Sequence, residues 1–215
     1  MIFDRERRIF NIERWLGRIT RRTGYTGQAR KRYKILYSEI VVPDNEKIAE
    51  TLHRVESEIK EVRSHEIGVV IDRSGREIYR VDGWENSVGI SSGCVKNRIV
   101  THNHPADDCM LSYKDVESTV KGDAYEVRVV VSNGRFVSLK KNAETWDDNI
   151  LIGLNNAYCC GSGLKFFERA ERAARIKHGG KITNLQIKKE AENIINEWFR
   201  VNAAKYNCLF KEDFI

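Results

Sequence analysis

The feature that most constrains the fold is a change in the spacing of apolar residues at Ser64-His65-Glu66. Before it, apolar side chains recur every three or four residues, which predicts one buried face of a helix over about 46–62. After it, residues 67–71 form a short apolar run that ends at an Asp-Arg-Ser-Gly turn, and residues 77–81 alternate like the second strand of a hairpin. A helix followed by paired strands is therefore expected.

The middle of the chain continues to alternate between strands and helices. A strand is predicted over residues 98–104 and ends at Pro105. The sequence Ser-Tyr-Lys-Asp at 112–115 has the form of a helical capping box and predicts a helix to about Lys121. An Asn-Gly pair at 133–134, between two apolar runs, is typical of a hairpin turn. We expect an α/β (α+β) fold with a mixed β-sheet flanked by helices.

Strand signals fade after about residue 146. Residues 164–178 and 185–205 are predicted helices, separated by a pair of glycines that commonly ends a helix. Three parts are therefore expected, namely a basic extension over 1–44, a central domain of strands and helices over 45–145 and a helical extension over 146–215.

The formal net charge of +6 is unevenly distributed. Residues 1–35 contain eleven Lys and Arg against three Asp and Glu, a balance of +8, which leaves −2 for the other 180 residues. Such an arm can bind nucleic acid, can bind an acidic protein partner, or can serve only as a solvated surface. The residues that we expect to make these contacts are Arg21, Arg22, Arg30, Lys31 and Arg32.

Two compositional features concern the compartment. No apolar run approaches the roughly 18 residues that a membrane span needs, and the first residues lack an apolar signal segment. The five cysteines are an odd number without a Cys-x-x-Cys pair, which favours reduced thiols with a packing role. A cytoplasmic protein with no membrane association is therefore expected.

The residues that most strongly suggest a metal site are His102 and His104. One residue separates them on a predicted strand, so both imidazoles face the same side. Asp115, in the first turn of the following helix, is a natural third ligand. Imidazole nitrogens with a carboxylate suit zinc, and three protein ligands leave one position for water, as in a catalytic site.

Two further residues complete a hydrolytic set. Glu66 begins the first predicted strand, where its carboxylate could accept a proton from a metal-activated water and transfer it to a leaving nitrogen. The hydroxyl of Ser112 could stabilise the negative oxygen that forms during the attack. The alternative for Ser112 and Asp115 is a helix cap without catalysis, and His65, Asp107 and Asp108 are interpreted as surface or loop residues.

The order Glu66, His102-x-His104, seven residues, then Ser112-x-x-Asp115 resembles the signature of the JAMM (MPN+, JAB domain) zinc metalloproteases. The sequence Thr-His-Asn-His-Pro at 101–105 is most similar to that of the prokaryotic and phage branches of this family, including RadC-type proteins. The resemblance covers less than half of the chain, and no family is recognised for its two ends.

The resemblance implies an MPN/JAB-like core that holds Zn²⁺ and hydrolyses peptide or isopeptide bonds, including those of ubiquitin-like conjugates, in a bacterial or phage-encoded protein. Two alternatives remain open. One is a RadC-like or phage protein associated with nucleic acid, including a nuclease, that uses residues 1–35. The other is a non-catalytic scaffold of the MPN type. The oligomeric state is not predicted.

Overall fold

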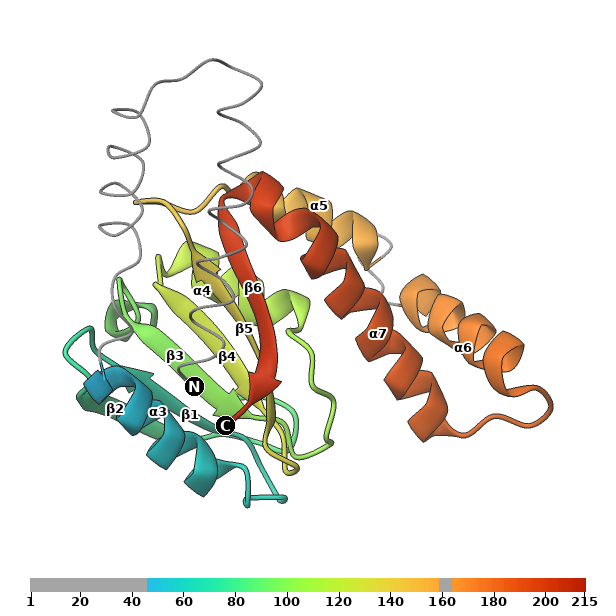
Figure 1. Cartoon of the computed structure of the whole chain (residues 1–215), viewed down its shortest axis with the longest axis horizontal. Helices are drawn as coiled ribbons and strands as arrows, with labels where there is room; N and C mark the ends of the chain where they lie inside the picture. The colour runs from blue at the N-terminus through green and yellow to red at the C-terminus, as the bar shows by residue number, and fades with distance from the viewer. Residues whose placement is uncertain (1–45, 159–163) are drawn as a thin grey trace, which may run out of the picture. The chain divides into compact units, whose positions relative to one another are not determined.

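The computed structural model describes residues 46–158 and 164–215, and the fold is stated for these ranges (Figure 1). They form an α+β arrangement around a mixed, six-stranded sheet. The strands are β1 (Ile67–Ile71), β2 (Glu77–Asp82), β3 (Ile99–Asn103), β4 (Glu126–Val130), β5 (Arg135–Lys141) and β6 (Cys208–Phe214). The helices are α3 (Glu46–Ile59), α4 (Tyr113–Lys121), α5 (Asn149–Ala157), α6 (Leu164–His178) and α7 (Asn184–Asn202), with short 3₁₀ turns at Ser92–Cys94 and Ala203–Tyr206.

The strand order is β2-β1-β3-β4-β5-β6. Only the central β3–β4 pair is parallel in this sheet, and α4 lies in the connection between these two strands. Parallel neighbours need a crossover connection, which explains why a helix follows β3. The expected mixed sheet with helices is confirmed.

Helices cover the two faces of the sheet with separate apolar clusters. On one face, Val55 and Ile59 of α3 pack against β1 (Figure 1). On the other face, α4, α5, α6 and α7 share a cluster with β4 and β5 that includes Val116, Ile195 and Phe199. The spacing of three to four residues between apolar side chains of α3 and the apolar run of β1 both follow from this arrangement.

Several predicted elements agree closely with the structure. The helix predicted over 46–62 ends at Ile59, and the first strand has the predicted bounds. The Asn-Gly hairpin joins β4 to β5, and Gly134 takes the left-handed φ of 81° that a side chain disfavours. The capping box at Ser112 is present.

The expectation of a purely helical segment after residue 146 is wrong for its end. Residues 208–214 form β6, which pairs antiparallel with β5 so that Cys208 lies opposite Lys141. The stretch Cys-Leu-Phe-Lys-Glu-Asp-Phe has three charges and little alternation, so it carries a weak strand signal. Residues 46–215 form one compact unit, which includes the helices that were expected to be an extension.

Some predictions fall on residues outside the described ranges. These are the basic arm, with Arg21, Arg22, Arg30, Lys31 and Arg32, and the adjacent cysteines at 159 and 160. Cys94, Cys109 and Cys208 are free thiols, the last two buried, as expected of packing residues. None of the helices in the described ranges is long and apolar enough to cross a membrane.

Candidate metal centre

His102 lies on β3, in the middle of the sheet, and His104 directly follows the last residue of that strand. Neighbouring strands on both sides bury them, and their exposed fractions are 3% and 8%. Opposite His102 in β1 is Gly68, where a Cβ atom would approach Ile90 Cδ1 to 2.7 Å. The missing side chain therefore lets the segment after β2 pack closely beside the histidines.

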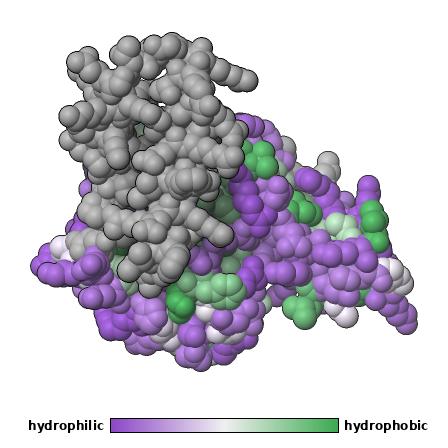
Figure 2. Space-filling view, viewed as in Figure 1, coloured by the Kyte–Doolittle hydropathy of each residue, from purple (hydrophilic) through white to green (hydrophobic). Residues whose placement is uncertain are grey.

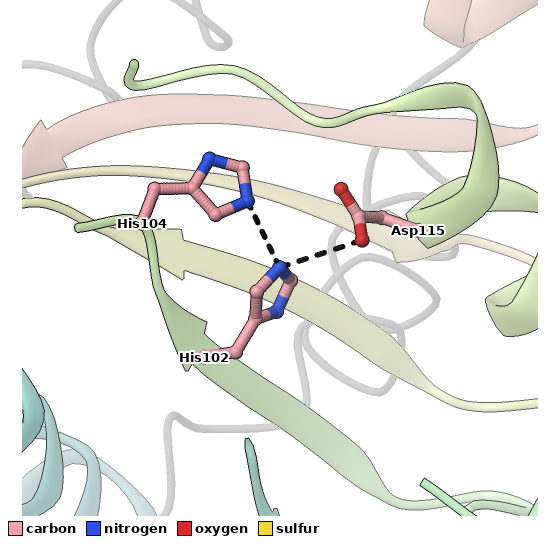
Figure 3. A group of neighbouring side chains, drawn as sticks. All are labelled: His102, His104 and Asp115. Atoms are coloured by element: carbon pink, nitrogen blue, oxygen red, sulfur yellow. Dashed lines mark hydrogen bonds and ion pairs between the residues drawn. The ribbon is translucent and has the colours of Figure 1, made fainter. Parts of the chain in front are cut away.

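Asp115 reaches the two histidines from the first turn of α4. The Nε2 atoms of His102 and His104 are 3.2 Å apart, and Asp115 Oδ1 is 3.4 Å from His102 Nε2. All three ligand atoms lie within 4.8 Å of one another. Figure 3 shows the two rings and the carboxylate pointing toward one another from a strand and a helix. This group could hold a metal ion.

The capping box orients the carboxylate of Asp115. Its Oδ2 accepts a hydrogen bond from the backbone N–H of Ser112 at 2.7 Å, while Ser112 Oγ accepts one from the backbone N–H of Asp115 at 3.2 Å. Oδ1 is thereby left facing His102. Burial opposes ionisation of this carboxyl, but the adjacent imidazoles and Ser112 outweigh it and hold the pKa of Asp115 below its usual range. Capping and ligation are therefore compatible at this residue.

The backbone of the loop after β3 orients His104. Its Nδ1 is 2.9 Å from the carbonyl oxygen of Asp108, which can only accept, so Nδ1 carries a proton and donates it. In the neutral ring, Nε2 then has a free lone pair directed toward Nε2 of His102. A cation at the meeting point would satisfy both rings and the carboxylate together, which is the usual arrangement of a metal-binding histidine.

Glu66 lies on the same face of the sheet as the histidines. Its backbone N–H donates to the carbonyl of Trp84, and its carbonyl accepts from Gly83, both at 2.8 Å. Gly68 lies opposite His102, and Glu66 precedes Gly68 by two residues, so the alternation of side chains puts Glu66 on the face that carries His102. Burial raises the pKa of Glu66 to about 7, with Asp115 and Asp108 adding to the rise and His104 opposing it.

Asn103 fixes the segment that carries Glu66, a role that the sequence reasoning missed. Its side chain points to the opposite face from the histidines, where Oδ1 accepts from Ile67 N–H at 2.6 Å and Nδ2 donates to the carbonyls of Val62 and His65 at 2.8 and 3.1 Å. These bonds bracket Glu66 on both sides. Nothing in the sequence around Asn103 distinguished it from its polar neighbours in this strand.

The loop aspartates also have defined partners. Asp107 accepts from Arg63 at 2.8 Å and from the backbone N–H of Ser132 at 3.1 Å, so it ties the segment before Glu66 to the loop after His104. Asp107 is exposed in this loop, as expected, and in addition has these partners. The carbonyl of Asp108, as described above, holds His104.

Tyr158 is a second neighbour that the sequence did not indicate. It follows α5, and its hydroxyl donates to the carbonyl of Leu111 at 2.9 Å. Burial, with further contributions from Asp115 and Asp108, raises its pKa above the usual value. Tyr158 thus brings a residue from the C-terminal part of the chain near the candidate ligand Asp115.

Comparisons with models of protein families, with curated proteins and with solved structures found no match. The functional interpretation therefore depends on the residues of the site. These are the converging ligand atoms of His102, His104 and Asp115, with Glu66 on the same face.

Proposed function

We propose that the protein is a zinc-dependent metallopeptidase or isopeptidase of the JAMM (MPN+, JAB domain) type, with an MPN-like core and a cytoplasmic location. The observation that carries the proposal is the convergence of two imidazole nitrogens and one carboxylate oxygen, at 3.2 and 3.4 Å, on a buried face that also carries Glu66. A structural ion pair would not need two histidines aimed at one point.

Zinc suits these ligands better than magnesium or calcium, which prefer oxygen. Zinc bonds of about 2.0–2.1 Å at tetrahedral angles separate neighbouring ligand atoms by roughly 3.3–3.4 Å. The separations between His102 Nε2 and its two neighbours, 3.2 and 3.4 Å, are close to this value. Three protein ligands leave one position open, as in catalytic zinc sites.

The bound ion would supply a water molecule of lowered pKa and a positive charge beside the scissile carbonyl. Glu66, when ionised, would accept the proton of the attacking water and transfer it to the leaving nitrogen. A pKa of about 7 is well matched to both steps. The Ser112 hydroxyl accepts from the Asp115 N–H, so its own proton is available for the oxygen that becomes negative.

The substrate is proposed from the resemblance, which favours a peptide or isopeptide bond of a ubiquitin-like conjugate. A non-catalytic scaffold is less favoured, because it has no physical need for Glu66 buried beside three converging ligands. Nucleic-acid binding through residues 1–35, with a nuclease activity, remains a prediction, because these residues lie outside the described ranges.

Zinc content tests the metal site. After dialysis against excess zinc and then buffer, elemental analysis should find about one zinc per chain in the wild type and much less in His102→Ala and Asp115→Ala. His53→Ala is the matched control, because His53 lies on α3 in an exposed position and should leave the zinc content unchanged. A wild-type protein that retains no zinc would contradict the proposal.

Hydrolysis of a ubiquitin-like protein joined to a lysine side chain tests the role of Glu66. Glu66→Gln should retain zinc but lose about 10²–10⁴-fold in rate, because it removes the proton carrier and not a ligand. Glu61→Gln, an exposed neighbour, is the control and should keep full activity. Loss of zinc from Glu66→Gln would show that Glu66 is itself a ligand.

A further inference from the structure

The strongest concentration of positive charge in the described ranges lies at the tip of the hairpin formed by α6 and α7. Residues 172–189, called the hairpin tip below, include six Lys and Arg and no Asp or Glu. All six side chains are exposed. They are Arg172, Arg175, Lys177, Lys181, Lys188 and Lys189.

Half of these cations are neutralised within the hairpin. Arg175 pairs with Glu171, Lys177 pairs with Glu190 at 2.7 Å, and Lys189 pairs with Glu192 at 2.6 Å. The other three, Arg172, Lys181 and Lys188, form no ion pair among the residues that the structure describes, although Lys188 lines a small pocket with Asp107 and Asp108. Their charges are therefore available to a ligand.

The hairpin tip is also accessible. Helix α6 packs mainly on α7, and α7 packs on the sheet through Ile195 and Phe199, while Figure 1 shows the turn between the two helices at the end farthest from the sheet. In the same view, Figure 2 shows a largely hydrophilic surface over this part. The turn contains Gly179 and Gly180, both with left-handed φ, and a Cβ atom at either would meet no other atom within 4 Å. A partner backbone can approach such a turn closely.

The charge of the remaining chain strengthens the argument. The whole chain sums to +6, residues 1–35 to +8 and the hairpin tip to +6, so residues 36–171 and 190–215 together sum to −8. When Glu171, Glu190 and Glu192, which pair with the tip, are counted with it, the tip sums to +3 and the other residues of these two ranges to −5. An acidic body with a basic tip repels a polyanion at one place and attracts it at another. This polarity would orient a polyanion on the tip.

We propose that the hairpin tip binds the phosphate backbone of a nucleic acid. Nucleic acid is favoured over an acidic protein because lysine, which supplies four of the six cations, is depleted in protein–protein interfaces, whereas lysine and arginine neutralise phosphates readily. The tip contains no Phe, Tyr or Trp on which bases could stack. Binding should therefore be independent of base sequence.

The test uses the full-length chain and two fluorescein-labelled probes, a 20-base-pair DNA duplex and a 20-nucleotide RNA. The double variant Lys181→Glu/Lys188→Glu is compared with Lys96→Glu/Lys205→Glu, which changes the net charge equally at exposed lysines elsewhere. We expect the first to bind the better probe at least about tenfold more weakly at 50 mM KCl and the control less than about twofold. The slope of log K against log salt should become shallower by about 2, because two phosphate contacts are lost.

Three results would overturn the proposal. If the wild type binds neither probe at low salt, an acidic protein becomes the better partner for the tip. If both double variants lose affinity equally, the attraction is general and not located at the tip. If the wild type binds and neither double variant has a lower affinity, another segment, such as residues 1–35, makes the contacts. Repeating the titration with His102→Ala separates this result from the proposed zinc site, on which it does not depend.

Discussion

The two faces of β3 carry two buried polar clusters that differ in how their charges are balanced. On one face, His102 and His104 meet Asp115. On the other, Thr101 of the same strand donates to Glu56 at 2.9 Å, and Arg128 of β4 joins them. Consecutive residues of one strand therefore contribute to clusters of different character.

The second cluster, called the Glu56 cluster, consists of Glu56, Thr101, Glu126 and Arg128, and its charges are balanced by one another. Arg128 donates from Nε and Nη2 to the two carboxylate oxygens of Glu56 at 2.6 and 2.9 Å, and from Nη1 to Glu126 at 3.0 Å. Its guanidinium lies 4.0 Å from the centroid of the Phe136 ring. Burial disfavours the cation, but the two carboxylates outweigh it and hold the pKa of Arg128 above its usual value. Every charge in this cluster has an adjacent opposite charge.

In the histidine cluster, formed by His102, His104 and Asp115, the atoms that could bind a metal ion face one another. Buried polar groups are normally hydrogen-bonded, and a group of lone pairs facing one another needs a proton or a cation between them. The contrast indicates that internal charge balance separates a structural polar cluster from one that can take a ligand. The same contrast leads to three predictions, which are given in order of the size of the expected effect.

The largest effect is expected from Arg128→Met. The Glu56 side chain is fully buried, so loss of its guanidinium partner leaves an uncompensated carboxylate and should lower the free energy of unfolding by about 3–5 kcal/mol. Urea denaturation measures this change. Zinc affinity should stay within a few-fold of the wild type, because the substitution lies on the other face of the sheet.

Arg76→Met is the matched control for that variant. Arg76 also pairs with a carboxylate, Asp72, but its side chain is 78% exposed, so the loss should be below about 1 kcal/mol. Equal losses in the two variants would show that the buried cluster contributes no more than a surface pair.

An intermediate effect is expected from Glu66→Gln in metal-free protein. The native state raises the pKa of Glu66 from 4.5 to about 7, so the native state retains a proton that the unfolded state releases. The stability of the wild type should therefore fall as pH rises from about 4.5 to 7, by at most about 3 kcal/mol, whereas the variant should lack this fall. Thermal or urea unfolding at pH 4, 6 and 8 measures the difference. If the free energy of unfolding of the variant at pH 8 does not exceed that of the wild type, the raised pKa of Glu66 is contradicted.

The smallest effect is expected from Ser112→Ala. It removes the oxygen that caps α4 and should cost about 1 kcal/mol. Zinc affinity should change by less than about tenfold, because Asp115 Oδ2 still accepts from the backbone N–H of residue 112. Zinc competition titrations check this, and a large loss of affinity would show that the hydroxyl itself orients the ligand.

Local signals account for much of what could be predicted from the sequence. The His-x-His spacing placed both rings on one face, and the Ser-x-x-Asp pattern set the start of α4 and with it the position of Asp115. The roles of Asn103 and Tyr158 could not be predicted, because their partners lie 36–41 and 47 residues away. Strand β6 was missed for a related reason, since an edge strand with three charges is held by its pairing with β5 and not by its own pattern.

The sequence by itself determined the periodicity of the helices and strands, the turn at Asn133-Gly134 and the set of three candidate ligands, because these depend on contacts between residues near in the chain. Only the tertiary structure decided that the ligand atoms meet at 3.2 and 3.4 Å, that Glu66 is buried on the same face, and that the last helices and β6 join the sheet. Those facts depend on strand register and on packing between distant segments, which no local pattern encodes.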